Sequence, residues 1–157
     1  MRNIKKIVLH AMFIAIYVAL IFIFMPLSKD VIQIRVADCL CILPIFDKFA
    51  ILSISIACFI SNMLVGNILD AIFGTLATLI GLIFTYLLRK KNYFIATLPT
   101  ILSNTLIIPF VLKYAYGLEK YPILISMLFV FIGEAISIYV FGYFLYKVIK
   151  NKNFLKQ

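Results

Sequence analysis

The sequence predicts an all-α integral membrane protein with six transmembrane helices, of which the second is short. Composition carries most of this prediction, because 65% of the 157 residues are hydrophobic and only 13% are charged, about half the charged share of a soluble domain. The mean hydropathy is +1.14. Charged residues and prolines also divide the chain into six apolar segments. At this length we expect a single membrane domain, residues 1–157, with no room beside it for a soluble catalytic module.

The six apolar segments follow one another with short polar breaks between them. They cover residues 7–27, 39–46, 49–69, 71–88, 92–112 and 121–146. A spanning helix needs about 20 mainly apolar residues. Five segments meet this length, whereas the second is interrupted by Asp47 and reaches it only if the region from Val31 contributes.

Basic residues predict the orientation of these helices. With six spans, eleven of the fifteen Lys and Arg residues fall on one side and four on the other, which places both termini in the cytoplasm by the positive-inside rule. With five spans the division is ten against five and leaves Lys5 and Lys6 outside, so we favour six. The net charge of +9 is explained by this topology and by anionic lipid headgroups. It requires no nucleic-acid partner.

Glu134 is the leading candidate for a functional residue. It is the lone carboxylate in an uncharged stretch that runs from Tyr121 to Tyr146. A charge in the middle of a membrane helix costs about 2.5–3.5 kcal/mol on insertion scales. A chain that keeps such a charge typically uses it to hold a ligand, an ion or a proton.

Other polar residues are expected in the outer half of the bundle, close to Glu134. They are Arg35 and Asp38 before the second segment, Asn62, Asn67 and Asp70 around the third connection, Asn104 in the fifth segment, and Tyr114, Tyr116 and Tyr121 beside the last outer loop. A small-molecule site is mostly apolar with a few placed polar groups. Amide and carboxylate groups together suit a planar, amide-rich heterocycle.

Each of these residues also has a purely structural interpretation. The arginine and aspartate of the first loop can form an interfacial ion pair, and Asp70 can cap the next helix. Asn62 and Asn104 can hydrogen-bond between helices, and the tyrosines can belong to an interfacial aromatic belt. The sequence leaves these alternatives open.

Several absences argue against an enzyme. The chain has no G-x-x-x-x-G-K-[ST] phosphate loop, so it cannot hydrolyse ATP by that route, and we expect it to carry no cofactor. Its single histidine, His10, stands at the start of the first segment, where we expect neither metal ligands nor a Ser–His–acid set around it. The three cysteines form no C-x-x-C pair and are predicted to be buried thiols.

The first segment carries a stripe of small residues. Ala11, Ala15 and Ala19 recur every four positions and therefore share one helix face, which would let another helix approach closely. The alternative is internal packing, since alanine is common in membrane helices. A similar face in the fourth segment, with Gly74, Ala77, Thr78 and Gly81, is taken as internal packing.

The whole chain resembles the queuosine-precursor transporter family (QueT), a group of substrate-binding S components of energy-coupling factor (ECF) transporters. The matching stretches are Gln33–Asp38 with Leu43-Pro44, Gly66–Leu79, Thr85–Arg89, Asn104 and Gly133-Glu134. The most specific is the Asn-x-x-Asp-x-x-Phe-Gly block of residues 67–74. One departure is Asp38, where a glutamate is expected.

The resemblance implies an S-component-like bundle that takes up a 7-deazaguanine, either the aminomethyl precursor or queuine. Glu134 would bind the base edge with help from Asn104, and Asp70, Asn67, Arg35 and Asp38 would complete the substrate site. The loop with Arg35 would act as a lid. The face of Ala11, Ala15 and Ala19 would dock onto a coupling transmembrane protein, on which two ATPase subunits drive release.

Two other readings remain. An S component for another vitamin, such as riboflavin or thiamine, would share the architecture and differ only in the pocket. A self-sufficient channel, or a homodimer packed through the alanine face, would need no ATPase module.

Overall fold

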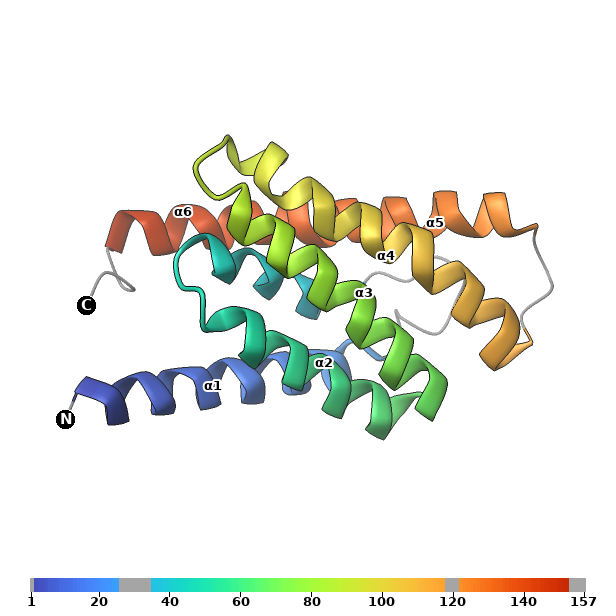
Figure 1. Cartoon of the computed structure of the whole chain (residues 1–157), viewed down its shortest axis with the longest axis horizontal. Coiled ribbons are helices and arrows are strands. Elements are labelled where there is room, and N and C mark those ends of the chain that lie inside the picture. The colour runs from blue at the N-terminus through green and yellow to red at the C-terminus, as the bar shows by residue number, and fades with distance from the viewer. Residues whose placement is uncertain (1, 26–34, 118–121, 153–157) are drawn as a thin grey trace.

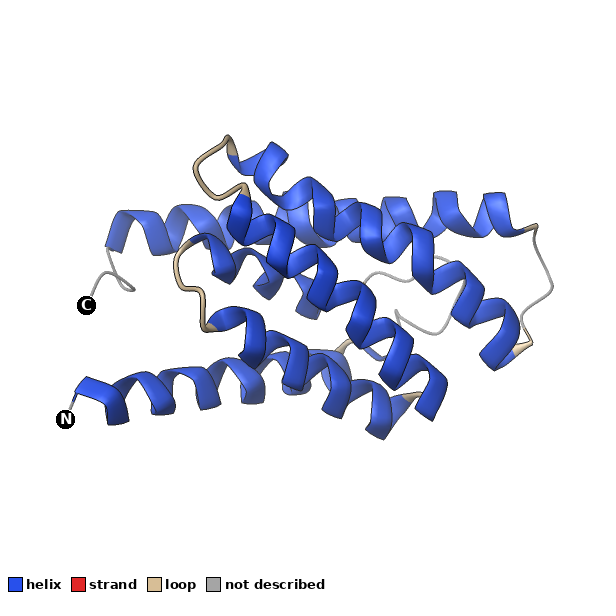
Figure 2. Cartoon of the chain, viewed as in Figure 1, coloured by secondary structure: helices blue, strands red, loops and turns tan. Residues whose placement is uncertain are grey.

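The structure is a computed structural model that describes residues 2–25, 35–117 and 122–152. Every regular element in these residues is helical, as Figure 2 shows. The helices lie mostly along the long axis of the molecule, and the start of α1 and the end of α6 are at the same end of it (Figure 1). We call this the terminal end. The predicted all-α membrane fold is confirmed.

Six helical stretches follow one another along the chain. They are α1 (Arg2–Ile23), η2 (Val36–Ile45), α2 (Ala50–Val65), α3 (Ile68–Leu87), α4 (Tyr93–Tyr116), and a last stretch made of α5 (Ile123–Ala135), η3 (Ile136–Gly142) and α6 (Tyr143–Lys152). Four segments are long and apolar enough to cross a membrane, namely 4–23, 68–87, 93–114 and 123–151. The second stretch is short, as predicted.

The third helix is shorter than the sequence predicted. The segment expected over residues 49–69 ends as a helix at Val65, so that α2 has 16 residues. The cause is local, because the Asn67 side chain accepts a hydrogen bond from the Asp70 backbone N–H at 2.9 Å and begins α3 there. Asparagine is among the preferred residues for this capping position.

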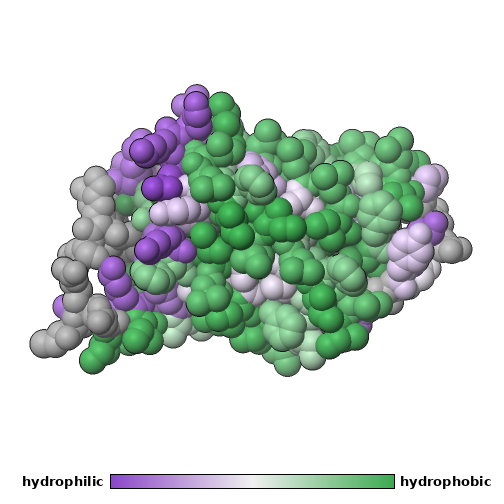
Figure 3. Space-filling view, in the orientation of Figure 1, coloured by the Kyte–Doolittle hydropathy of each residue, from purple (hydrophilic) through white to green (hydrophobic). Residues whose placement is uncertain are grey.

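The outer surface of the bundle is apolar. Large hydrophobic side chains are exposed on each of the long helices, among them Ile7, Leu76, Phe110 and Leu128. In Figure 3 they cover the middle of the visible face, while hydrophilic residues gather mainly at the terminal end. A continuous apolar surface of this kind is typical of a membrane-facing protein.

The short helix η2 lies inside the bundle and contacts all the other helices except α5 closely. It is a 3₁₀ helix of ten residues, and residues 37–44 are all buried. Runs of 3₁₀ helix longer than three or four residues are uncommon. Tertiary packing around η2 therefore holds its geometry. The helix η2 packs against both α1 and the last helical stretch of the chain.

Helix α3 packs closely on α4 through small residues. A Cβ added at Gly81 would lie 2.5 Å from the Thr100 Cα and 2.7 Å from the Ser103 Oγ. Ala77 and Thr78 are also buried. The small-residue face of this helix therefore serves internal packing, as the sequence suggested.

The last helix changes its winding next to Glu134. Residues 136–142 form a π-helical stretch between two α-helical ones. Such stretches often mark functional sites. Gly142 is the last residue of this stretch and lets it pack closely on η2, because a Cβ there would lie 3.1 Å from the Ile42 Cγ2.

Candidate functional site

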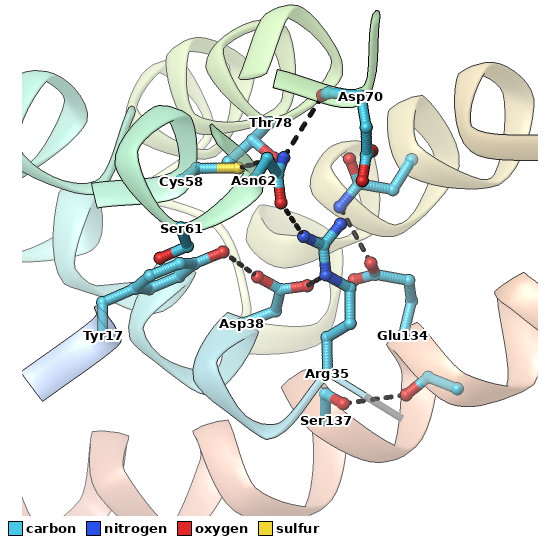
Figure 4. A network of polar contacts seen from close by, with 12 residues as sticks. Tyr17, Arg35, Asp38, Cys58, Ser61, Asn62, Asp70, Thr78, Glu134 and Ser137 are labelled. Atoms are coloured by element: carbon cyan, nitrogen blue, oxygen red, sulfur yellow. Dashed lines mark hydrogen bonds and ion pairs between the residues drawn. The ribbon is translucent and has the colours of Figure 1, made fainter. Parts of the chain in front are cut away.

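Polar side chains from several helices meet inside the bundle (Figure 4). We call this group the polar cluster: Tyr17 on α1, Arg35 and Asp38 at η2, Asn62 on α2, Asp70 on α3, Asn104 on α4 and Glu134 on α5. The cluster lies beyond the middle of α1, near the end of α2 and near the start of α3. It therefore lies in the half of the molecule opposite the terminal end.

Glu134 and Asn104 form a buried pair in this cluster. The Asn104 Nδ2 donates a hydrogen bond to the Glu134 Oε1 at 2.9 Å, and the two residues are 1% and 2% exposed. The structure thus brings together the two residues assigned to the base edge. An amide that donates to a carboxylate fixes its plane and leaves the second oxygen available.

Arg35 and Asp38 lie inside the bundle, rather than in an exposed interfacial ion pair. The Arg35 Nε is 4.0 Å from the Asp38 Oδ2, and the Asp38 side chain is 2% exposed. Arg35 also donates a hydrogen bond from Nη2 to the Asn62 Oδ1. The loop residues 26–34, including Gln33, are outside the described part of the chain, and so is most of the predicted lid.

Asp70 and Asn67 divide their roles at the start of α3. Asn67 occupies the N-cap position of α3, and Asp70 lies in the first turn, where its backbone N–H donates to the Asn67 side chain. The Asp70 carbonyl accepts from the Asn62 Nδ2 at 3.3 Å. Gly74 leaves room for both residues, because a Cβ there would lie 2.8 Å from the Asn62 Nδ2 and 3.1 Å from the Asp70 Oδ1.

Three acceptor atoms of the polar cluster have no hydrogen-bond partner among the described residues. They are the Asp38 Oδ2, the Asn104 Oδ1 and the Glu134 Oε2. Leaving a buried acceptor unsatisfied costs about 1–3 kcal/mol, and more for a charged group. Three such atoms in one cluster make it a candidate site for a molecule that supplies hydrogen-bond donors. The Asp38 and Glu134 side chains are also within hydrogen-bonding reach of each other.

The polar cluster contains more acidic side chains than basic ones. It contains one guanidinium, Arg35, and three carboxyl groups, those of Asp38, Asp70 and Glu134. Arg35 interacts electrostatically with both aspartates, and Asp38 and Arg35 are the charged groups with the largest effect on Glu134. The surplus of carboxyl groups makes the site suited to a cationic ligand rather than an anionic one.

Sequence reasoning missed Tyr17. This tyrosine is fully buried, and its hydroxyl donates a hydrogen bond to the Asp38 Oδ1 at 2.6 Å. Its only signal in the sequence was its place two residues from Ala15 and from Ala19, which puts it on the opposite side of α1 from the alanine face. Tyr114 is 73% exposed and lies outside the cluster, and the side chains of Tyr116 and Tyr121 are not described.

The alanine face of α1 points outward. Ala11, Ala15 and Ala19 are all exposed, and only 11% of the spanning segment of α1 is buried, against 50% of the one in α4. The alternative that these alanines pack internally is therefore wrong for this chain.

A Ser–His–Asp group does form around His10, contrary to expectation. The His10 Nδ1 is 2.9 Å from the Ser53 Oγ, and the Nε2 is 3.3 Å from the Asp47 Oδ2. The Ser53 hydroxyl also donates to the Phe49 carbonyl at 3.2 Å, within the same helix turn. The group joins α1 to the start of α2 near the terminal end, and we interpret it as a structural contact.

No metal site is found in the part of the chain that the structure describes, because no three His, Cys, Asp or Glu side chains there are placed to share an ion. The cysteines Cys39, Cys41 and Cys58 are free and buried, as predicted. Cys58 lies beside the polar cluster, with its Sγ 3.5 Å from the Asn62 Nδ2 and from the Thr78 Oγ1.

Comparison with known proteins identifies the family. The profile of the QueT transporter family matches residues 7–151, which is nearly the whole chain. Searches of curated proteins and of solved structures found no significant match. The matched region contains every residue of the polar cluster and the alanine face, so the chain belongs to the QueT transporter family and is a membrane transporter protein.

Proposed function

We propose that this protein is the substrate-binding S component of an ECF-type importer and that it takes up a queuosine precursor. The observation that carries this proposal is the set of three buried acceptors on Asp38, Asn104 and Glu134 that receive no hydrogen bond from the described residues. They lie in a chain of a transporter family, inside a bundle whose outer surface is apolar. The ligand would supply the missing donors.

A 7-deazaguanine matches these acceptors. Its base edge carries an N1–H and an exocyclic amine, which one carboxylate can accept side by side. Glu134 would accept this edge, with its plane held by the hydrogen bond from Asn104. The aminomethyl form is also cationic near neutral pH, and Asp38 and Asp70 supply the negative charge that would attract it.

The energy for uptake would come from partner subunits. The exposed alanine face of α1 offers a smooth helix surface on which a coupling transmembrane protein can pack. That partner would bind two ATPase subunits, which hydrolyse the ATP that this chain has no phosphate loop to bind.

We assign the terminal end to the cytoplasm. The start of α1, the end of α6 and most of the hydrophilic residues on the visible face lie there (Figures 1 and 3), and eleven of the fifteen basic residues fall on that side in the six-span topology. The positive-inside rule then orients the chain. The polar cluster would lie in the outer half of the membrane, where it can receive a ligand from outside.

Calorimetric titration of the purified, detergent-solubilised protein tests the ligand. The aminomethyl deazaguanine and queuine are the probes, and riboflavin is the control. Tight binding of a deazaguanine alone supports the proposal. Binding of riboflavin instead would keep the architecture and exclude this substrate class. Absence of binding to all three by folded protein would favour a self-sufficient channel or homodimer.

A bulky side chain on α1 tests the partner. Ala15→Trp should abolish copurification with the coupling protein and stop uptake, while ligand binding by the isolated subunit persists. Ile16→Trp is the matched control, because Ile16 is 43% exposed but lies about 100° away around the helix. Uptake that survives Ala15→Trp would place the docking surface elsewhere.

A further inference from the structure

The helix α1 has two faces with different surroundings. Ala15 and Ala19 are exposed, whereas Tyr17, midway between them in sequence, is fully buried. Each residue turns an α-helix by about 100°, so Tyr17 lies about 160° from both alanines around the axis. The same helix therefore carries the proposed docking face on one side and a polar group of the ligand site on the other.

Tyr17 holds one oxygen of the Asp38 carboxylate, whose other oxygen faces Arg35 but receives no hydrogen bond from the described residues. Its hydroxyl donates to the Asp38 Oδ1 at 2.6 Å, and the Asp38 Oδ2 has no hydrogen-bond partner among the described residues. That second oxygen is 4.0 Å from the Arg35 Nε. A hydrogen bond to one oxygen fixes the rotation of the carboxyl group and so fixes the direction in which the Oδ2 is presented.

Helix α1 is the least buried of the spanning segments, at 11%, and it packs mainly on α2 and η2. A peripheral helix can shift with less loss of packing than a central one. Any shift of α1 relative to η2 would change the Tyr17–Asp38 hydrogen bond, because Tyr17 lies on α1 and Asp38 on η2. A shift of α1 would therefore act on the ligand site through the Tyr17 side chain.

We propose that Tyr17 is a positioning residue that couples the docking face of α1 to the affinity of the ligand site. This proposal rests on the function proposed above. With α1 seated as in this structure, Tyr17 orients Asp38 toward a cationic group of the ligand. A partner that engages the alanine face and displaces α1 releases Asp38 and weakens binding. By thermodynamic linkage, bound ligand then weakens engagement of α1 by the same factor.

A purely structural role for Tyr17 makes a different prediction, and Tyr93 supplies the comparison. Tyr93 is also a buried tyrosine, and its hydroxyl donates to the Ile138 carbonyl at 2.5 Å. It lies outside the polar cluster. Tyr17→Phe and Tyr93→Phe each remove one buried hydroxyl and keep the ring. If both tyrosines only stabilise the fold, the two variants should behave alike toward ligand.

The first test uses two probes in calorimetric titrations of the detergent-solubilised protein. These are the aminomethyl deazaguanine and the 7-methyl deazaguanine, which lacks the amine. Tyr17→Phe should weaken binding of the aminomethyl probe by about tenfold, as expected for a hydrogen bond to a charged group, and should change binding of the methyl probe by less than about twofold. Tyr93→Phe should change neither affinity, although both variants lower the melting temperature.

The second test measures coupling in nanodiscs, with and without the copurified coupling module. For wild type, the module should weaken binding of the aminomethyl probe, and Tyr17→Phe should remove most of that difference. Equal effects of the two Phe variants, or an equal loss for both probes, would overturn the proposal. Wild type that binds neither probe would overturn the proposed function, and this coupling with it.

Discussion

The polar cluster and a group of aromatic residues differ in how their polar atoms are satisfied. The second group, which we call the aromatic cluster, consists of Phe46, Tyr93, Phe94, Tyr139, Tyr143 and Tyr146. Its rings contact one another, with centroids 4.8 Å apart for Tyr93 and Tyr146 and 5.2 Å apart for Phe94 and Tyr139. Its hydroxyls at Tyr93 and Tyr139 donate to backbone carbonyls.

This difference separates stability from function. In the aromatic cluster, ring contacts and satisfied hydroxyls stabilise the packing of the last helix on its neighbours. The polar cluster instead keeps three buried acceptors without hydrogen-bond partners among the described residues. Such acceptors lower stability, so a chain that retains them gains something other than stability. We interpret the gain as ligand binding.

The largest expected effect comes from removing the charge of Glu134. Glu134→Gln keeps an oxygen that can accept from the Asn104 amide but loses the negative charge and one acceptor. Truncating one partner of a buried charged hydrogen bond costs about 2–5 kcal/mol of binding. We expect this loss for the aminomethyl deazaguanine by calorimetry, with an unfolding free energy that is unchanged or raised, because a buried charge has been removed.

Asp47→Asn is the matched control for this substitution. It also replaces a carboxylate by an amide, at the contact with His10, where the atoms are 3.3 Å apart. We expect a small loss of thermal stability and unchanged ligand affinity. If Glu134→Gln bound the probe as tightly as wild type, the assigned role of Glu134 would be lost.

Two glycine substitutions compare the clusters directly. A Cβ at Gly74 would lie 2.8 Å from the Asn62 Nδ2, so Gly74→Ala should displace Asn62 and the arginine bound to it. We expect about a tenfold loss of ligand affinity, equal to the ~1.4 kcal/mol typical of one polar contact. For this variant and for Gly142→Ala, ligand affinity is measured by calorimetry and stability by thermal unfolding.

Gly142→Ala is the counterpart in the aromatic cluster. Its Cβ would lie 2.7 Å from the Tyr93 hydroxyl and 3.1 Å from the Ile42 Cγ2. Overpacking of this kind costs about 1–3 kcal/mol of stability. We expect the melting temperature to fall and the ligand affinity to stay within about twofold. A loss of affinity as large as that of Gly74→Ala would mean that the two clusters are not independent.

The sequence predicted the helices and the principal carboxylate for simple physical reasons. Lengths of apolar runs follow from membrane thickness, and a lone charge such as Glu134 is visible in any apolar stretch. Pairings across the bundle were not predictable in this way. The contact of Arg35 with Asn62 joins residues 27 positions apart, and nothing in either local sequence specifies it.

The contacts of Tyr17 and His10 also could not be predicted from the local sequence. Helical spacing tells which residues of α1 share a face, but the neighbouring helices decide which face is buried. Tyr17 is therefore an ordinary aromatic residue in the sequence and a carboxylate partner in the structure. His10 lacked visible partners because Ser53 is 43 positions away. The 3₁₀ geometry of η2 likewise depends on the helices that surround it.

The smallest expected effect comes from Tyr139→Phe. The Tyr139 hydroxyl donates to the Phe94 carbonyl at 3.2 Å, at an exposed position, so its loss should cost less than about 1 kcal/mol of stability. The ring contact with Phe94 persists, and ligand affinity should not change. The substitution lies five residues from Glu134 on the same helix, which makes it a strict test. If calorimetry showed weaker binding, the π-helical stretch would transmit changes to Glu134, and the separation between a stabilising cluster and a binding cluster would fail.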